Sequence, residues 1–569
     1  MLSHFAGLKK YQPCIPWLAA ILLPLVWLWP TLVNPSFSLI DDPTMFKAFW
    51  HIDADFWGWL THEAFRGEIE NGRLRPMYWL TRYFLPYKLL PNPLDPLSWH
   101  IAQYVFLIII LTNVFVSLRL FTKSLLIPWT ACTLWILNAK TMENFVRLAT
   151  AEVWQLFWLS LIFVTGYWLC CPSPKTRKEL LYVAVFFFLF MAYFCKETSV
   201  LLLPVAGIFF IGSLLIKRRR QAWFVFFLSN LLIFLVYHFL SPPITGYTSA
   251  FKLSPELMLK NIILYAPFIQ WHFPFCLTVL TFLGRRLVRV VQKRSPVSLE
   301  PMELWQWGSL ILGTEFLLIL LPWALPEQRY LVMVDFFFAI FMAIECRRLW
   351  DNLLFFLTSR RPALNKRSLF ISAIGAAYIA VLVILGYSSQ AGLTYFLRYE
   401  YGQALHRTPV QSLEQFSKAA KPGAKVLIFY EENEIIRSVA ILLGGVFDRK
   451  DLELYTFSQF ADNYRKQGYP FVQLKQGDWP AVLHQVDYVY WSRQGMRKLN
   501  IDLFHTQLMN SALNSIYITA LRLVYSDLYY PIPGRAHGTQ VWEINKAAIW
   551  GIEKMMSFQA GKKSAEVTS

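Results

Sequence analysis

The chain has 569 residues, of which 56% are hydrophobic and only 16% are charged, whereas about a quarter of a soluble domain is charged. A mean hydropathy of +0.39 and repeated apolar runs exclude an ordinary soluble protein and indicate a polytopic membrane protein. The formal net charge is +18, but the basic residues lie in short connections between apolar runs, which argues against nucleic-acid binding.

Eleven apolar runs predict membrane-spanning helices. In chain order they cover residues 15–33, 99–121, 125–138, 150–170, 180–195, 198–216, 221–241, 261–284, 304–325, 329–346 and 369–390. The runs at 125–138 and 180–195 are short for a span of about 20 residues. They are retained because the charge of the flanking connections alternates across them.

The basic residues predict the orientation of these spans. With the N-terminus in the cytoplasm, the cytoplasmic connections hold 20 Lys and Arg, and the short outer connections hold six. Since this bias is consistent at every crossing, residues 34–98 and 391–569 are both expected outside the cytoplasm. The sequence has no N-x-S/T sequon, which favours a bacterial inner membrane, with both regions in the periplasm.

The two outer regions differ in character. Residues 34–98 are rich in aromatic residues and predict amphipathic helices lying on the membrane surface. Residues 391–550 predict a separate small α/β domain, and residues 551–569 a polar, disordered tail. The expected strands are 425–430, 452–457 and 488–492, and the expected helices are 432–443 and 458–467.

An acidic pair, Asp41 and Asp42, follows the first apolar run. Asp42 precedes Pro43 and is suited to cap a helix that begins at this proline. Asp41 has no such role, and the adjacent negative charge raises its affinity for a proton, as suits a general base. Together the two carboxylates also suit a divalent cation such as Mg²⁺ or Mn²⁺.

Several cationic residues beside the outer ends of spans are candidates for holding a phosphate. Arg73 and Arg75 are two apart in GRLRP, so in an extended segment they share a face. Lys196 lies in a very short turn between two spans, and Arg329 with Tyr330 begins a later span. The alternative for each is ordinary contact with lipid headgroups or an interfacial anchor.

Further ionisable residues lie on the same predicted side, where charges beside spans are costly unless paired or hydrated. They are His62, Glu63, Glu143, Arg147, Glu152, Glu197 and Glu327. Water or headgroup contact explains any one of them. Their gathering on one side favours a functional site.

The acidic pair, GRLRP, the Lys196-Glu197 turn and Arg329-Tyr330, in this order and on one side, resemble the GT-C glycosyltransferases. Within this family, the sequence most resembles the branch that contains the protein O-mannosyltransferases and aminoarabinose transferases. WHIAQYVFLIIILTN (99–113) is similar to that branch's second span, and NAKTMENFVRLATAEVW (138–154) to its second outer loop. The resemblance covers residues 15–390 and implies a mainly α, GT-C-like membrane domain.

The resemblance also implies a reaction. The donor is a sugar on a polyprenyl phosphate, and the sugar transfers with inversion to an acceptor hydroxyl on a glycan, lipid or protein. Asp41 matches the base, Glu143 the second-loop acid, and Glu152 an alternative to Glu143. Lys196 and Arg329 match phosphate-binding positions, and no cofactor or metal is required.

Three alternatives remain: a transporter or flippase of a lipid-linked glycan, a surface-polysaccharide polymerase or ligase, and a non-catalytic scaffold. Transporters usually place charges near the bilayer midplane and show repeats, whereas these charges crowd one side. Polymerases carry their large loop late in the chain rather than after the first span.

Overall fold

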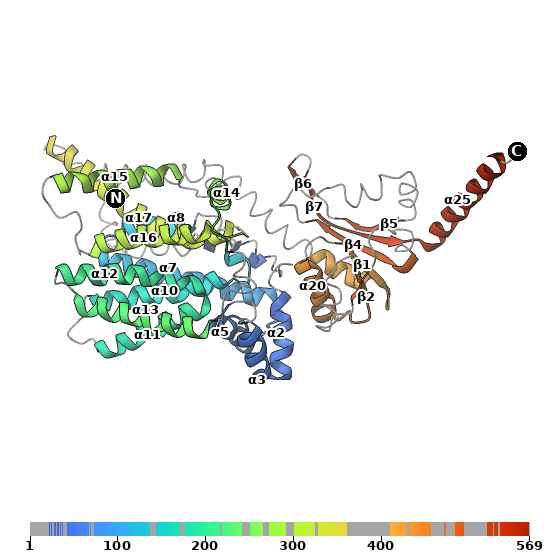
Figure 1. Cartoon of the computed structure of the whole chain (residues 1–569), viewed down its shortest axis with the longest axis horizontal. Helices are drawn as coiled ribbons and strands as arrows, with labels where there is room; N and C mark the ends of the chain where they lie inside the picture. The colour runs from blue at the N-terminus through green and yellow to red at the C-terminus, as the bar shows by residue number, and fades with distance from the viewer. Residues whose placement is uncertain are drawn as a thin grey trace, which may run out of the picture. The chain divides into compact units, whose positions relative to one another are not determined.

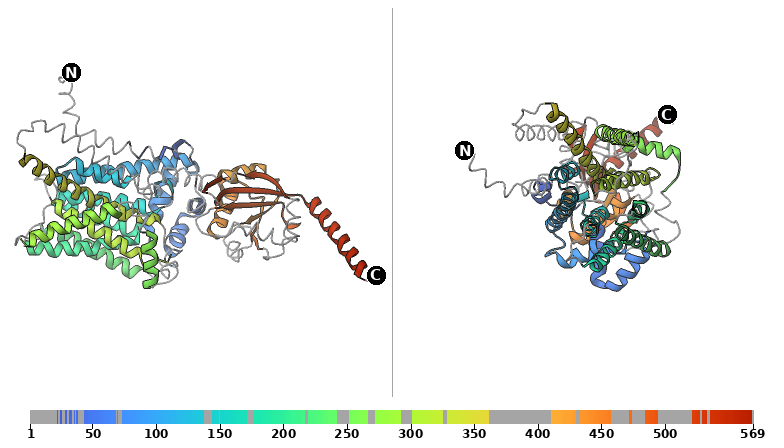
Figure 2. Two further views of the ribbon diagram at one scale, coloured as in Figure 1. Left: turned by 90° about the horizontal axis from the view of Figure 1, so that it is seen from above. Right: turned by 90° about the vertical axis from the view of Figure 1, so that its left-hand side faces the viewer.

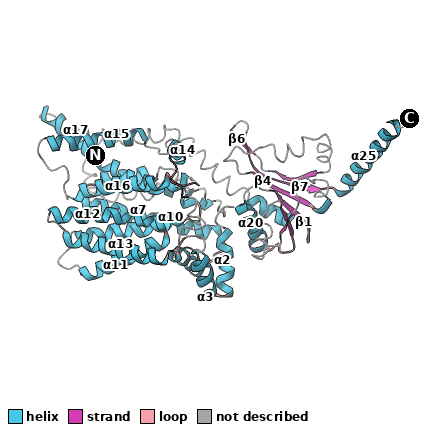
Figure 3. Cartoon of the chain, viewed as in Figure 1, coloured by secondary structure: helices cyan, strands magenta, loops and turns pink. Residues whose placement is uncertain are grey.

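In the computed structural model the chain divides into two compact units. The first unit comprises Met1–Asn34 and His51–Tyr399, and the second comprises Pro35–Trp50 and Glu400–Ser569. The described residues are isolated positions between 22 and 37, then 43–67, 69, 73–136, 144–148, 150–170, 177–216, 219–241, 251–265, 272–291, 301–324, 328–360, 410–429, 433–456, 471–473, 484–493, 521–526, 529–532 and 535–567. The first unit is helical, and the sheet belongs to the second unit (Figures 1 and 3).

Long helices that run side by side make up most of the first unit (Figures 1 and 2). They are α7 (Pro96–Thr122), α8 (Leu126–Ile136), α10 (Ala151–Cys170), α11 (Lys178–Cys195), η5 (Glu197–Leu201) leading into α12 (Leu202–Ile216), α13 (Arg220–Leu240), α15 (His272–Val291), α16 (Pro301–Leu320) and η8 (Gln328–Leu331) leading into α17 (Val332–Arg360). The short helix α14 (Pro255–Tyr265) lies between α13 and α15 in the sequence. Within the described ranges, four segments are long and apolar enough to cross a membrane: Pro96–Thr122, Lys178–Cys195, Glu197–Leu215 and Arg220–Leu240.

Local sequence signals set the ends of α7, the longest of these four segments. The Asp95 side chain caps its first turn by accepting a hydrogen bond from the Leu97 N–H at 3.1 Å, and Pro96 takes the first helical position. Lys123 ends the helix in a left-handed conformation with φ of 53°. Between these two ends, apolar residues of α7 such as Leu107 are buried in the core of the bundle.

Buried aromatic packing and a few polar contacts join the helices. Helix α10 packs against both α7 and α11, and α17 packs against α8 and α16. The Trp135 indole N–H of α8 donates to the Val332 carbonyl of α17 at 3.3 Å. Asn113 of α7 donates to the Ser160 hydroxyl of α10 at 3.0 Å. Hydrogen bonds of this kind hold apolar helices together where the surroundings supply no water.

One predicted span differs from the helices of the bundle. Residues 261–284 were expected to form one span, but α14 ends at Tyr265 and α15 begins at His272, so that prediction is wrong. Pro267 lies between the two helices in the sequence, and a proline removes a helical N–H donor. The predicted span at 369–390 and most of that at 15–33 lie outside the described residues.

Short helices fill the region between the first two predicted spans. They are α2 (Pro43–Ala54), α3 (Phe56–Gly58), η3 (Trp59–Gly67), α5 (Pro76–Trp79), η4 (Leu80–Phe84) and α6 (Leu85–Leu89). Inside them Trp79 stacks on Tyr83, with ring centroids 4.6 Å apart. Trp57 and Leu89 are 70% and 75% exposed. Such exposed apolar side chains suit a membrane surface, which remains a prediction.

The second unit contains a seven-stranded sheet, drawn in magenta in Figure 3. Its strands are β1 (Lys425–Phe429), β2 (Glu453–Thr456), β3 (Phe471–Gln473), β4 (Tyr488–Arg493), β5 (Leu521–Ser526), β6 (Tyr529–Ile532) and β7 (Arg535–Ile544). The order is β3-β2-β1-β4-β7-β5, with β6 also paired to β7. Strands β1 to β4 are parallel, and β7 is antiparallel to each neighbour.

Three of these strands, β1, β2 and β4, lie where the sequence predicts them. Between β1 and β2 lie α20 (Asn433–Ile441) and η9 (Leu442–Val446), in place of one helix at 432–443. The predicted helix at 458–467 lies outside the described residues.

The prediction of a disordered polar tail after residue 550 is wrong for residues 551–567, which belong to α25 (Lys546–Val567). This segment has no proline and is rich in Ala, Lys, Glu and Met, which are favourable in helices.

Candidate functional site

A tight turn between α11 and η5 positions Lys196 and Glu197. Lys196 is extended, with φ of −150° and ψ of 122°, and its N–H donates to the Ala192 carbonyl at 3.0 Å. The Ser199 N–H in turn donates to the Lys196 carbonyl at 3.0 Å. This single extended residue ends one helix and starts the next, so both ionisable side chains lie at a helix end.

A buried glutamine fastens this turn to α10. The Gln155 amide donates to the Ser199 hydroxyl at 2.9 Å and to the Thr198 hydroxyl at 3.1 Å. The Ser199 hydroxyl in turn donates to the Ala192 carbonyl at 2.9 Å. Gln155 is fully buried, and buried polar groups need partners of this kind. The turn is therefore held rigidly against α10.

Lys196 forms a mostly buried ion pair with Glu152 in the first turn of α10. Their Nζ and Oε1 atoms are 3.0 Å apart, and the side chains are 15% and 7% exposed. The Lys196 ammonium also lies 5.6 Å from the centre of the Tyr330 ring, which η8 supplies. Three segments far apart in the sequence thus meet at one cation.

Glu197 faces the arginines of the segment between the first two predicted spans. Arg75 Nε lies 4.0 Å from Glu197 Oε2, and the Arg75 side chain is only 8% exposed. The Arg75 guanidinium also lies 5.2 Å from the centre of the Tyr78 ring. The charges of Lys196, Arg75 and Arg73 all act on Glu197.

We call Arg73, Arg75, Glu152, Lys196, Glu197 and Tyr330 the lysine cluster. It holds three cations and two carboxylates, and each carboxylate lies beside a cation of the cluster. A buried ion pair is strong only when its geometry is good, and the 4.0 Å contact of Arg75 with Glu197 is long. The cluster can therefore accept a further anion by exchanging a carboxylate for it.

Several site residues predicted from the sequence are not described by the structure, or only in part. Asp41, Asp42, Glu143 and Glu327 lie outside the described residues, and of Arg329 only the backbone, in η8, is described. Their predicted roles as base, cap, second acid and phosphate ligand remain predictions.

The remaining candidates have other partners. Glu63 forms an ion pair with His51, and His62 is exposed on η3. The Arg147 carbonyl accepts a hydrogen bond from the buried Gln103 side chain at 3.3 Å.

The described residues contain no group of three or more His, Cys, Asp or Glu side chains placed to hold a metal ion. The pair Asp41–Asp42 is not among them, so the alternative of a bound cation there remains open.

Two buried polar residues were not predicted. Gln155 lies three residues after Glu152, which places both on one face of α10. A glutamine inside an apolar run is the sequence feature that could have identified it. Asp335 is 1% exposed in the first turn of α17. An acidic residue five positions after Tyr330 is the sequence feature that could have identified it.

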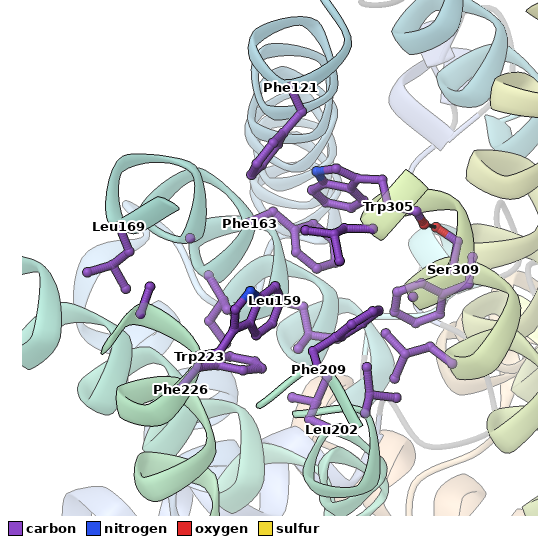
Figure 4. A pocket seen from close by; sticks show the side chains of 18 residues that line it. Phe121, Leu159, Phe163, Leu169, Leu202, Phe209, Trp223, Phe226, Trp305 and Ser309 are labelled. Atoms are coloured by element: carbon purple, nitrogen blue, oxygen red, sulfur yellow. Dashed lines mark hydrogen bonds between the residues drawn. The ribbon is translucent and has the colours of Figure 1, made fainter. Parts of the chain in front are cut away.

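An apolar cavity of about 140 Å³ lies among α7, α10, α12, α13, α16 and α17 (Figure 4). Phe121, Phe163, Phe209, Trp223 and Trp305 contribute much of its wall. No residue of the lysine cluster lines it. Its surface suits a hydrocarbon chain rather than a charged group.

No family model and no curated protein matches the sequence. Solved structures do match. The apo oligosaccharyltransferase of Archaeoglobus fulgidus aligns with a TM-score of 0.53 at 11% identity, over 85% of this chain and 70% of that one. ArnT from Cupriavidus metallidurans in the apo state aligns with a TM-score of 0.49 at 12% identity, over 92% of this chain and 97% of ArnT. Mycobacterial arabinofuranosyltransferase AftD aligns with a TM-score of 0.40 at 9% identity, over 94% of this chain and 41% of AftD.

At such low identity a match establishes the fold alone, and the oligosaccharyltransferase match carries that conclusion. Together with the apolar helices, it identifies an integral membrane protein. The chain shares the fold of the Archaeoglobus fulgidus oligosaccharyltransferase.

Proposed function

We propose that the protein is a membrane glycosyltransferase that moves a sugar from a polyprenyl-phosphate donor to an acceptor hydroxyl outside the cytoplasm. The observation that carries this proposal is the lysine cluster, in which Lys196 of the α11–η5 turn lies beside Glu152 and Tyr330, and Arg75 lies beside Glu197. A phosphate at a helix end needs such a set of positive groups.

The cluster suits a donor that arrives and leaves. Without donor, Glu152 neutralises Lys196 and Glu197 neutralises Arg75, so no buried cation is left without a nearby carboxylate. A donor phosphate would take over these contacts and gain the positive charge of Arg73 as well. Arg329, beside Tyr330 in the sequence, is proposed to add a further contact.

The proposed reaction is a single displacement. Asp41 removes the proton from the acceptor hydroxyl, whose oxygen attacks the anomeric carbon of the sugar as the bond from that carbon to the phosphate oxygen breaks. The configuration inverts because attack and departure occur on opposite sides. The phosphate carries the departing negative charge, which Lys196 and the arginines stabilise. One carboxylate is sufficient because phosphate needs no acid to leave, unlike a glycosidase leaving group.

Sequence patterns alone support the finer parts of this proposal. Asp42 is proposed to cap the helix at Pro43, and Glu143 to orient the acceptor. The absence of an N-x-S/T sequon supports a bacterial inner membrane, and the charge bias of the connections supports a position of the second unit outside the cytoplasm. There, the second unit is proposed to bind the acceptor glycan, lipid or protein.

The test uses the purified full chain with undecaprenyl phosphate carrying radiolabelled mannose or aminoarabinose, and membranes from cells lacking the gene as acceptor. Asp41→Asn is compared with wild type. The matched control is Asp55→Asn, because Asp55 caps α3 through a hydrogen bond from the Gly58 N–H at 3.0 Å and asparagine also caps well. Loss of a general base lowers the rate about 10²- to 10⁴-fold. Equal transfer by wild type and Asp41→Asn would remove Asp41 from the mechanism.

A further inference from the structure

A second polar cluster lies further along α17, away from Tyr330. Its members are Arg285, Arg286 and Arg289 of α15, Glu303 and Gln306 of α16, and Glu345 and Arg348 of α17. We call it the arginine cluster. Glu345 is 13 residues beyond Val332, which at about 1.5 Å per residue is roughly 20 Å along the helix. It is therefore separate from the lysine cluster.

Two carboxylates hold the arginines of this cluster in place. Glu303 accepts from Arg286 at 3.0 Å and from Arg289 at 2.8 Å. Arg348 Nη2 lies 3.6 Å from the same carboxylate. Glu345 Oε2 accepts from both Arg285 and Gln306 at 2.5 Å, and Gln306 Oε1 accepts from Arg348 at 2.5 Å.

The positive charge of the cluster exceeds what these carboxylates balance. The members of the cluster include four guanidinium groups and two carboxylates, which gives the cluster a formal charge of +2. Glu303 and Glu345 are 2% and 0% exposed and Arg286 is 6% exposed, whereas Arg285, Arg289 and Arg348 are 21%, 34% and 11% exposed. The anions thus form the floor, and the latter three arginines reach toward the surface. Unbalanced charge at partly buried positions is costly, and a bound anion would relieve it.

The arginines also retain hydrogen-bonding capacity. Each guanidinium has five N–H donors in a planar fork that matches a phosphate. Arg285 Nε is buried and donates to no acceptor in the described part of the chain. An anion at the rim would find several donors already oriented by Glu303, Glu345 and Gln306.

The sequence context favours a phosphate at this position. The cluster joins the two connections predicted to be the most basic on the cytoplasmic side, 285–294 and 347–367. Anionic phospholipids are enriched in the cytoplasmic leaflet, and basic pockets between helices on that side bind their headgroups. We propose that the arginine cluster binds a phosphate group, the chemistry shared by an anionic phospholipid headgroup and free phosphate.

The experiment measures thermal unfolding of the delipidated full chain in detergent. The midpoint is followed against the concentration of phosphatidylglycerol, phosphatidylcholine or sodium phosphate, with chloride keeping the ionic strength equal. Wild type is compared with Arg348→Gln and with Arg289→Gln, whose more exposed side chain makes it the gentler change. The control is Arg347→Gln, which removes the same charge from a neighbouring position where the partner, Asp351, is 51% exposed.

Phosphatidylglycerol, but not phosphatidylcholine, is expected to raise the midpoint of wild type and Arg347→Gln. Arg348→Gln and Arg289→Gln are expected to need about 10-fold more lipid for the same rise, the usual consequence of losing one charge-assisted hydrogen bond. A rise with sodium phosphate alone would identify free phosphate as a sufficient ligand, and a rise with the lipid only would identify the headgroup. Equal responses of all four proteins, or no response of wild type to either ligand, would overturn the proposal.

Discussion

The lysine and arginine clusters lie at two levels of one helical unit and balance charge differently. In the lysine cluster Glu152 lies 3.0 Å from Lys196, and Glu197 lies 4.0 Å from Arg75. In the arginine cluster each carboxylate is shared, and several contacts are 3.0 Å or shorter. The first arrangement suits a site that exchanges a carboxylate for a ligand. The second suits a site that keeps its carboxylates and adds a ligand to them.

The largest stability effect is expected at the floor of the arginine cluster. Glu303→Gln leaves Arg286, Arg289 and Arg348 without their shared carboxylate and should lower the free energy of unfolding by about 3–5 kcal/mol. Asp351→Asn, which removes only an exposed pair with Arg347, should cost at most about 1 kcal/mol. Thermal and denaturant unfolding in the same detergent measure both. Equal effects would show that burial of the carboxylate is irrelevant.

The lysine cluster is expected to affect transfer more than stability. Lys196→Gln should lower sugar transfer about 10²- to 10³-fold, the range for one preorganised charge-stabilising group. Glu152→Gln leaves Lys196 without its carboxylate and should be destabilising. The double variant should recover stability but not transfer. Recovery of both in the radiolabel assay would mean that Lys196 serves only the fold.

A smaller effect should follow from a conservative change at Arg75. Lysine keeps the charge but loses the planar fork, so Arg75→Lys should lower transfer about 10-fold, the equivalent of one charge-assisted hydrogen bond. The exposed Arg66 of η3 supplies the control, and Arg66→Lys should transfer normally. Full activity of Arg75→Lys in steady-state kinetics would restrict Arg75 to a general electrostatic role.

The smallest effect is expected at a surface pair outside both clusters. The Tyr87 hydroxyl donates to Asp53, and this bond lowers the pKa of Asp53 below its ordinary value of 3.8, with Lys88 adding to the effect. The resulting stability is present above pH 3.8 and is lost as the pH falls through the lowered pKa. Asp53→Asn should therefore cost up to about 1 kcal/mol at pH 7 and much less at pH 2. Unfolding midpoints of wild type and variant at both pH values provide the check.

Local signals made part of this molecule predictable. The strands at β1, β2 and β4 follow from short apolar runs bounded by polar residues, and Lys196 was conspicuous as a charge between two apolar spans. The arginine cluster was not predicted, because its arginines read simply as positive residues at the ends of spans. Their pairing with Glu303 and Glu345 depends on how α15, α16 and α17 pack, which no local pattern reports.

The most direct test of the central claim is the affinity of the purified full chain for undecaprenyl phosphate, the carrier part of the proposed donor. We expect measurable binding by wild type and binding about 10- to 100-fold weaker in Lys196→Gln, since a charge-assisted contact contributes about 1.5–3 kcal/mol. Arg347→Gln, which changes the same charge outside the lysine cluster, should bind like wild type. Unchanged affinity of Lys196→Gln, or no binding by wild type, would contradict the account.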